Sequence, residues 1–190
     1  MGVVGFIILA IIIILIIYGF ALYNNLVSLK NNVATAWSNI DVLLKQRHDE
    51  LPKLVETCKQ YMGYEQETLV KVMQAREDVQ QARASGNVAA LGPAEGQLRA
   101  TIGNLFAVAE AYPNLKANES FQQLQTRITG LENSIADRRE FYNDSVNVFN
   151  TRIEQFPEAL IARNFGFKEA SRLEIASDEK KDVDMKALFT

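Results

Sequence analysis

The first charged side chain in this sequence is Lys30. Before it, residues 3–22 form an almost unbroken run of aliphatic and aromatic side chains. A helix of about 20 apolar residues rises roughly 30 Å, which matches the hydrocarbon thickness of a bilayer. A soluble bundle of this size has no use for a helix that is apolar on every face. The run therefore predicts a transmembrane anchor over residues 1–23, in contact with the lipid bilayer. The residues taken as membrane-spanning include Val3, Phe6, Ile11, Leu15, Tyr18 and Leu22.

A cleaved secretory signal is the main alternative for this segment. Such a signal starts with a basic region, has an apolar core of about 7–15 residues and ends at a small-x-small cleavage site. Here the start has no Lys or Arg, the apolar run is longer, and residues 22–25 offer no convincing cleavage site. An uncleaved anchor is therefore favoured.

The flanking charges predict the orientation of this anchor. Basic side chains follow it, at Lys30 and then at Lys45, Arg47 and Lys53, whereas none precedes it. The positive-inside rule then places a short N-terminus outside and the following domain in the cytoplasm. The single cysteine, Cys58, cannot form an internal disulfide and suits a reducing compartment.

The rest of the chain has the apolar spacing of amphipathic helices. The first helix can run on directly from the anchor, and Pro52 inside it predicts a kink. A second helix is expected over about 65–84, followed by a loop that extends to Gly92 and Pro93. A third is expected over about 93–111 and a fourth from the N-cap Asn118 to about residue 156. The apolar stripe of the first helix consists of Leu26, Leu29, Val33, Trp37, Ile40, Leu44, Leu51, Leu54 and Cys58.

These elements predict an all-α fold, in which an N-terminal transmembrane helix is followed by an antiparallel up-and-down four-helix bundle over residues 24–156. Its first and last helices are the long ones. An overhang of these two helices is either a coiled-coil surface for homo-oligomers or a simple two-helix stalk. Residues 157–190 form a partly irregular C-terminal extension. Its last apolar residues (Val183, Met185, Leu188, Phe189) either dock within the assembly, which is favoured, or bind a partner.

Counting residues excludes most catalytic chemistry. His48 and Cys58 are the only residues of their kind, and ten helical residues place them about 15 Å apart, too far for a Cys–His dyad. No Cys or His cluster exists for zinc, and no phosphate-binding glycine motif occurs. A formal charge of −3 argues against nucleic acid as a partner. The sequence therefore predicts no catalytic, metal or cofactor-binding residues and no enzyme.

Two segments remain as candidate interaction sites. The polar cluster at residues 45–50 contains Arg47 and His48, and is interpreted either as an inter-helix contact, a lipid head-group site or, preferably, a solvated face. Phe165 and Phe167 flank a glycine and suggest a protein-contact or membrane-interface element, with docking on the core slightly favoured. Trp37, Tyr112, Phe141, Tyr142 and Phe149 are expected in the core.

Several long motifs resemble the LemA family of bacterial membrane proteins. They include AWSNIDV at residues 36–42, LFAVAEAYPNLKAN at 105–118, and shorter stretches at 23–27, 45–49, 51–57, 139–144, 156–157 and 165–167. The resemblance extends from the anchor to about Phe167. It implies one membrane helix with a short outer N-terminus, a four-helix bundle, and no established activity or cofactor.

The same resemblance suggests what such a protein does. A magnetosome-membrane relative suggests a membrane-organising role, and gene neighbourhoods in the family suggest a membrane zinc metalloprotease or another envelope protein as partner. We therefore expect a non-catalytic helical scaffold that is anchored in the bacterial inner membrane and forms homo-oligomers. The alternative is an adaptor or regulator of a membrane protease or envelope-stress pathway.

Overall fold

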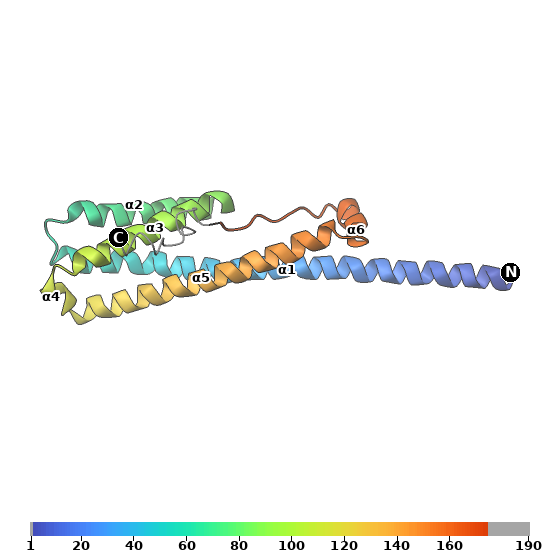
Figure 1. Cartoon of the computed structure of the whole chain (residues 1–190), viewed down its shortest axis with the longest axis horizontal. Coiled ribbons are helices and arrows are strands. Elements are labelled where there is room, and N and C mark those ends of the chain that lie inside the picture. The colour runs from blue at the N-terminus through green and yellow to red at the C-terminus, as the bar shows by residue number, and fades with distance from the viewer. Residues whose placement is uncertain (1, 175–190) are drawn as a thin grey trace, which may run out of the picture. The chain divides into compact units, whose positions relative to one another are not determined.

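The computed structural model of the chain describes residues 2–174 and is helical throughout its regular parts (Figure 1). The apolar residues predicted to dock near the C-terminus, Val183 to Phe189, lie outside the described residues. The helices are α1 (Val3–Lys59), α2 (Gln66–Ala84), α3 (Val88–Ala109), α4 (Pro113–Lys116), α5 (Glu119–Glu154) and α6 (Glu158–Phe165). This arrangement confirms the all-α prediction, with long first and last bundle helices.

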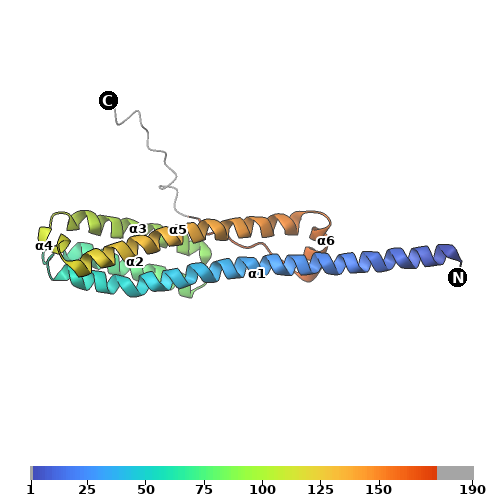
Figure 2. The ribbon, with the colours of Figure 1, turned by 90° about the horizontal axis from the view of Figure 1, so that it is seen from below.

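Helix α1 continues without interruption from the apolar run into the bundle, and it passes through Pro52. Its N-terminal part is long and apolar enough to cross a membrane, with a mean hydropathy of 3.2 in its most apolar window. The large side chains from Val3 to Tyr18 are all exposed. Figure 2 shows α1 as one continuous helix. Leu26 is the first large residue of α1 that is completely buried.

The bounds of α3 differ from the sequence prediction. Asn87 caps this helix, because its Oδ1 accepts a hydrogen bond from the backbone N–H of Ala90 (3.1 Å). The helix therefore starts five residues before the expected Pro93 and includes Gly92, so the predicted loop there is wrong. A proline inside a helix costs a backbone hydrogen bond, and here α3 tolerates it near its first turns. The predicted cap of α5 is confirmed, since Asn118 Oδ1 accepts from the N–H of Phe121 (3.0 Å).

The described chain divides into two compact units. The first contains residues 1–42 and 136–172, and hence the N-terminal part of α1, the C-terminal part of α5 and α6. Its core joins Leu26, Ala36 and Ile40 of α1 to Val146 and Phe149 of α5. Trp37, which is partly exposed, places its ring 5.5 Å from that of buried Tyr142.

The second unit contains residues 43–135 together with Leu173 and Glu174. Here the C-terminal part of α1, α2, α3 and the first half of α5 alternate in direction (Figure 1). The predicted stripe is confirmed for α1, where each stripe residue of this unit is buried. The core of the unit consists of Leu44, Leu51, Leu54, Cys58, Leu69, Val72, Leu98, Ile102, Leu105, Phe121 and Ile128.

Candidate functional site

Arg47 lies in the middle of the second unit and is almost completely buried. Its Nη2 atom is 2.5 Å from Glu95 Oε1 of α3, and its Nη1 atom is 2.7 Å from Glu132 Oε1 of α5. We call these three residues the Arg47 cluster. It connects three helices through charge-assisted hydrogen bonds, for which the planar guanidinium is well suited.

Burial and charge act in opposite directions on Arg47. Burial lowers the pKa of the guanidinium, but the carboxylates of Glu95 and Glu132 outweigh this and hold the pKa above its ordinary value. Within the described part of the chain, Arg47 Nε has no hydrogen-bond partner. Arg47 is therefore permanently charged and is held by its two carboxylates.

Further ion pairs surround the Arg47 cluster. Arg99 Nε lies 3.8 Å from Glu132 Oε2. Buried Glu50 forms ion pairs with Arg127 (3.1 Å) and Lys53 (3.2 Å). The charges at the centre of this unit thus neutralise one another, and this pairing offsets the desolvation cost of burying an ion.

His48, the next residue along α1, contacts α2. Arg76 Nε donates a hydrogen bond to the His48 carbonyl (2.9 Å), and Arg76 Nη2 lies 2.5 Å from His48 Nε2. An arginine can only donate, so Nε2 accepts and the imidazole is neutral with its proton on Nδ1. Burial, together with the positive charge of Arg76, lowers the pKa of His48.

These contacts correct the interpretation of residues 45–50 as a solvated face. Lys45, Gln46 and Asp49 are exposed as expected, but Arg47 and Glu50 are buried. The physical reason is that oppositely charged partners neutralise them inside the bundle: Glu95 and Glu132 pair with Arg47, and Arg127 and Lys53 pair with Glu50. Of the interpretations considered, the inter-helix contact describes Arg47 and His48 within this chain.

Glu95 and Glu132 were not identified from the sequence. Glu95 lies four residues after Leu91 and three before Leu98, on the buried stripe of α3. Arg47 likewise takes the position between Leu44 and Leu51 where the stripe of α1 lacks an apolar residue. A charged residue at an apolar stripe position on two different helices is the signal that predicts a buried pair.

The second candidate segment forms an aromatic cluster in the first unit. The ring of Tyr23 lies 4.8 Å from that of Phe165 and 5.9 Å from that of Phe167. Phe149 of α5 joins at 6.4 Å from Phe167. These distances are typical of favourable ring pairs. Phe167 packs against Tyr23 and Phe149, in agreement with the docking on the core that the sequence favoured. Phe165 contacts Tyr23 but is largely exposed.

The remaining expectations on aromatic residues have mixed outcomes. Tyr142 and Phe149 are buried, as expected for the core. The expectation that Phe141 lies in the core is wrong, because its side chain is more than half exposed. It directly precedes Tyr142 on α5, and adjacent helical residues point in directions about 100° apart, so only one of the two can face the core.

The chain after α6 is fastened to α5 by polar contacts. Gly166 ends α6 in the left-handed conformation (φ 70°), as C-terminal glycines commonly do. Asn150 then both donates to the carbonyl of Ala170 and accepts from its N–H, each at 2.9 Å. Tyr142 Oη donates to the carbonyl of Ser171 (2.8 Å).

The residues with potential nucleophilic chemistry do not form a site. Cys58 is buried in the core of the second unit, and burial raises the pKa of its thiol to about 11. A protonated, inaccessible thiol is inert. Among residues 2–174, no group of three or more His, Cys, Asp or Glu side chains is arranged to hold a metal ion.

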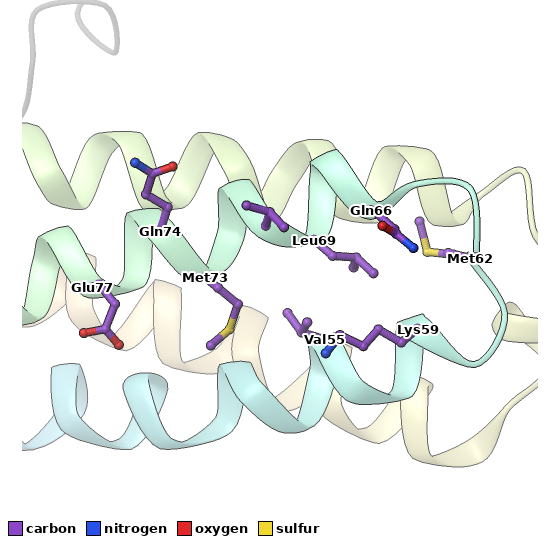
Figure 3. A pocket seen from close by; sticks show the side chains of 10 residues that line it. Val55, Lys59, Met62, Gln66, Leu69, Met73, Gln74 and Glu77 are labelled. Carbon is purple, nitrogen blue, oxygen red and sulfur yellow. The ribbon is translucent and has the colours of Figure 1, made fainter.

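An apolar groove lies between the end of α1 and α2, with a volume of about 810 Å³ (Figure 3). Val55, Met62, Leu69 and Met73 supply its apolar lining. Polar groups occur at its edges, including Lys59, Gln66, Gln74 and Glu77. Flexible methionine side chains are typical of surfaces that adapt to different apolar partners. No pattern in the sequence predicts this groove, because its lining comes from two helices and the loop between them.

Together, the fold and its polar centre define a class: a helical bundle on a membrane-length apolar helix, whose buried charges are paired with one another. The model of the LemA family matches residues 36–186, and the chain belongs to this family.

Three characterised relatives show the breadth of this similarity. Protein LemA of Metamycoplasma hominis is 29% identical over 167 residues, which cover 87% of this chain and 74% of that protein. Magnetosome protein MamQ 2 of Paramagnetospirillum magneticum is 24% identical over 171 residues, covering 78% of this chain and 63% of the relative. Magnetosome protein MamQ of Magnetospirillum gryphiswaldense is 22% identical over 169 residues, covering 77% and 62%. The chain thus spans less than two thirds of the MamQ proteins. These names and the apolar helix are those of a membrane-associated protein.

Proposed function

We propose that this protein is a non-catalytic scaffold of the bacterial inner membrane, anchored by α1 and self-assembling through its helical part. The observation that carries the proposal is a pair of apolar residues on α5. Phe141 and Val148 lie seven residues apart, both are about half exposed, and both belong to the unit that contains the apolar run. Residues seven apart share one helix face, which is the spacing of a helix–helix contact.

The charge distribution supports a structural role. The residues best suited to bind or activate a substrate are buried Arg47, buried Glu95 and partly buried Glu132, and both carboxylates bond to Arg47. A buried ion pair of this kind fixes which helices pack together, because any alternative packing would leave a charge unpaired. Its contribution is to the fold, and the exposed apolar positions remain for contacts with other molecules.

Assembly is tested on the full chain in detergent by analytical ultracentrifugation and in membranes by cross-linking. Wild type should sediment as an oligomer, and the double variant Phe141→Glu/Val148→Glu should be monomeric with unchanged helix content. Val70→Glu is the matched control, since Val70 is exposed on α2 and outside the first unit. A wild type that is monomeric at every concentration, with no larger cross-linked species, contradicts the proposal.

A second candidate is an adaptor for another envelope protein, such as a membrane protease. The apolar groove of Figure 3 favours it, since an apolar segment of that protein would find a concave surface with adaptable methionines. Purification from membranes should recover the same enzyme with wild type and with Lys71→Asp, which lies outside the groove lining, but lose it with Met73→Asp. Equal recovery with all three proteins contradicts the adaptor role.

A further inference from the structure

Helix α6 lies beside α1 at the point where the apolar run ends. The contact is direct, since the Phe165 ring lies 4.8 Å from the Tyr23 ring. Residues 3–22 span about 30 Å as a helix, the full hydrocarbon thickness of a bilayer. Tyr23 therefore falls at the membrane–water interface when α1 crosses the membrane, and aromatic rings favour this position. Phe165 lies at the same level.

Large apolar side chains in α6 and just before it are exposed. Phe156 is 82% exposed, Leu160 57% and Phe165 63%. Burial of Ala162 shows that α6 packs inward with a small residue and leaves its large apolar side chains outside. We call these three residues, which lie within ten positions of one another, the apolar patch. Soluble surfaces seldom expose so many large apolar side chains in a short segment, and such exposure marks interaction sites.

The charges around this patch do not oppose contact with lipid. Glu158, the acidic residue at the start of α6, is buried and paired with Arg152 (2.7 Å). The exposed charges closest to Phe165 in the sequence are the basic Arg163 and Lys168. The exposed acids Glu154 and Glu169 lie outside α6 on either side. Short amphipathic elements with this composition insert their apolar side chains into the head-group region.

We propose that α6, with Phe156, is a second membrane-contacting element that lies in the interface of the same leaflet in which α1 ends. This goes beyond the scaffold function, because it holds for a monomer and rests only on membrane anchorage by α1. The partner is the lipid surface itself, identified by the continuity of the patch with the membrane-spanning segment. Its effect is to fix the first unit against the bilayer at two points.

Depth-dependent quenching tests this assignment in the full-length protein. In a Cys58→Ala background, Leu160→Cys is labelled with an environment-sensitive fluorophore and reconstituted into phosphatidylcholine vesicles, with or without phosphatidylglycerol. The vesicles contain lipids with a nitroxide at the head group or deep in the acyl chain. Val42→Cys is the matched control, because Val42 is 55% exposed and lies about 30 Å beyond Leu22 along α1. Ile12→Cys, labelled in the same way, reports whether α1 spans the bilayer.

We expect the probe at position 160 to be quenched by head-group nitroxides about twofold or more relative to position 42, as a shallow interfacial location requires. Anionic lipid should add little, since insertion is apolar. A probe at 160 that remains in water overturns the proposal. A shielded probe that no nitroxide quenches also overturns it, because another protein molecule then covers α6. If acyl-chain nitroxides do not quench the probe at position 12, α1 does not span the membrane and the anchorage is overturned as well. The probe at position 12 therefore distinguishes failure of the anchorage from failure of the α6 proposal alone.

Discussion

The backbone oxygen of Glu174 lies where a side chain on Gly92 would begin. Only a residue without a side chain allows another segment to approach a helix so closely. Leu173, immediately before, is buried in the same unit. The end of the described chain is therefore packed against α3 through direct backbone contact.

The first prediction concerns this contact. Gly92→Ala should lower the free energy of unfolding by about 1–3 kcal/mol, because the obstructing atom belongs to backbone and cannot rotate away. The segment around Leu173 should also become accessible to protease. Urea unfolding and limited proteolysis measure the two effects. Gly103→Ala in the same helix is the control, since no atom lies within 4 Å of its added Cβ, and it should gain about 0.5–1 kcal/mol. Equal behaviour of the two variants would show that the close contact is absent.

The second prediction concerns Asn150, which uses its amide to bond both backbone groups of Ala170. Asn150→Ala removes two hydrogen bonds and should cost about 1–3 kcal/mol. Asn150→Asp keeps the acceptor but loses the donor, and should have an intermediate effect. Hydrogen exchange at the Ala170 amide distinguishes the variants, with the order wild type slowest and Ala fastest. Identical exchange in all three proteins would contradict the contact.

The third prediction concerns Arg47. Arg47→Met removes the arginine that neutralises buried Glu95 and partly buried Glu132, leaves Glu132 only the more distant Arg99, and should cost about 3–5 kcal/mol. Arg47→Met/Glu95→Gln/Glu132→Gln removes the charges together and should recover much of this loss. Thermal and urea unfolding of the full chain in detergent measure both. Lys45→Met, an exposed change two residues away, should alter stability by less than about 0.5 kcal/mol. A single variant as stable as this control would mean that Arg47 is not buried.

The fourth prediction is a pH dependence from His48. Folding lowers the pKa of this side chain, so the unfolded chain binds the proton more tightly than the folded one. The stability is therefore complete above the unfolded pKa of about 6.5 and falls as the pH decreases through that value towards the folded pKa. His48→Asn should flatten the curve of urea midpoint against pH between about 7.5 and 5.5. An unchanged slope would assign the effect to other groups.

The fold was predictable because it follows from local patterns. The 3- and 4-residue spacing of Leu44, Leu51 and Leu54 identified the buried face of α1, and Asn118 identified the start of α5. The error at Gly92 arose because Gly-Pro commonly marks a loop, whereas here the glycine provides room for a distant segment.

The candidate sites were less predictable because they depend on distant partners. Arg47 bonds to residues 48 and 85 positions away, and no periodicity in the sequence relates them. The sequence identified Arg47, His48, Phe165 and Phe167 as residues of interest without revealing what each contacts. In α6 the same limit applies, since eight residues are too few for a clear period, and its position beside Tyr23 follows from long-range packing.

The unbroken course of α1 from Val3 to Leu26 has a consequence for how its sequence can vary. A helix turns about 100° and rises about 1.5 Å per residue. Inserting one residue between these positions would rotate the face that receives α6 by more than a quarter turn and shift it along the membrane normal. Seven inserted residues nearly restore the angle but raise that face by about 10 Å. Substitutions of one apolar residue for another in this span should therefore be tolerated, whereas insertions and deletions should not.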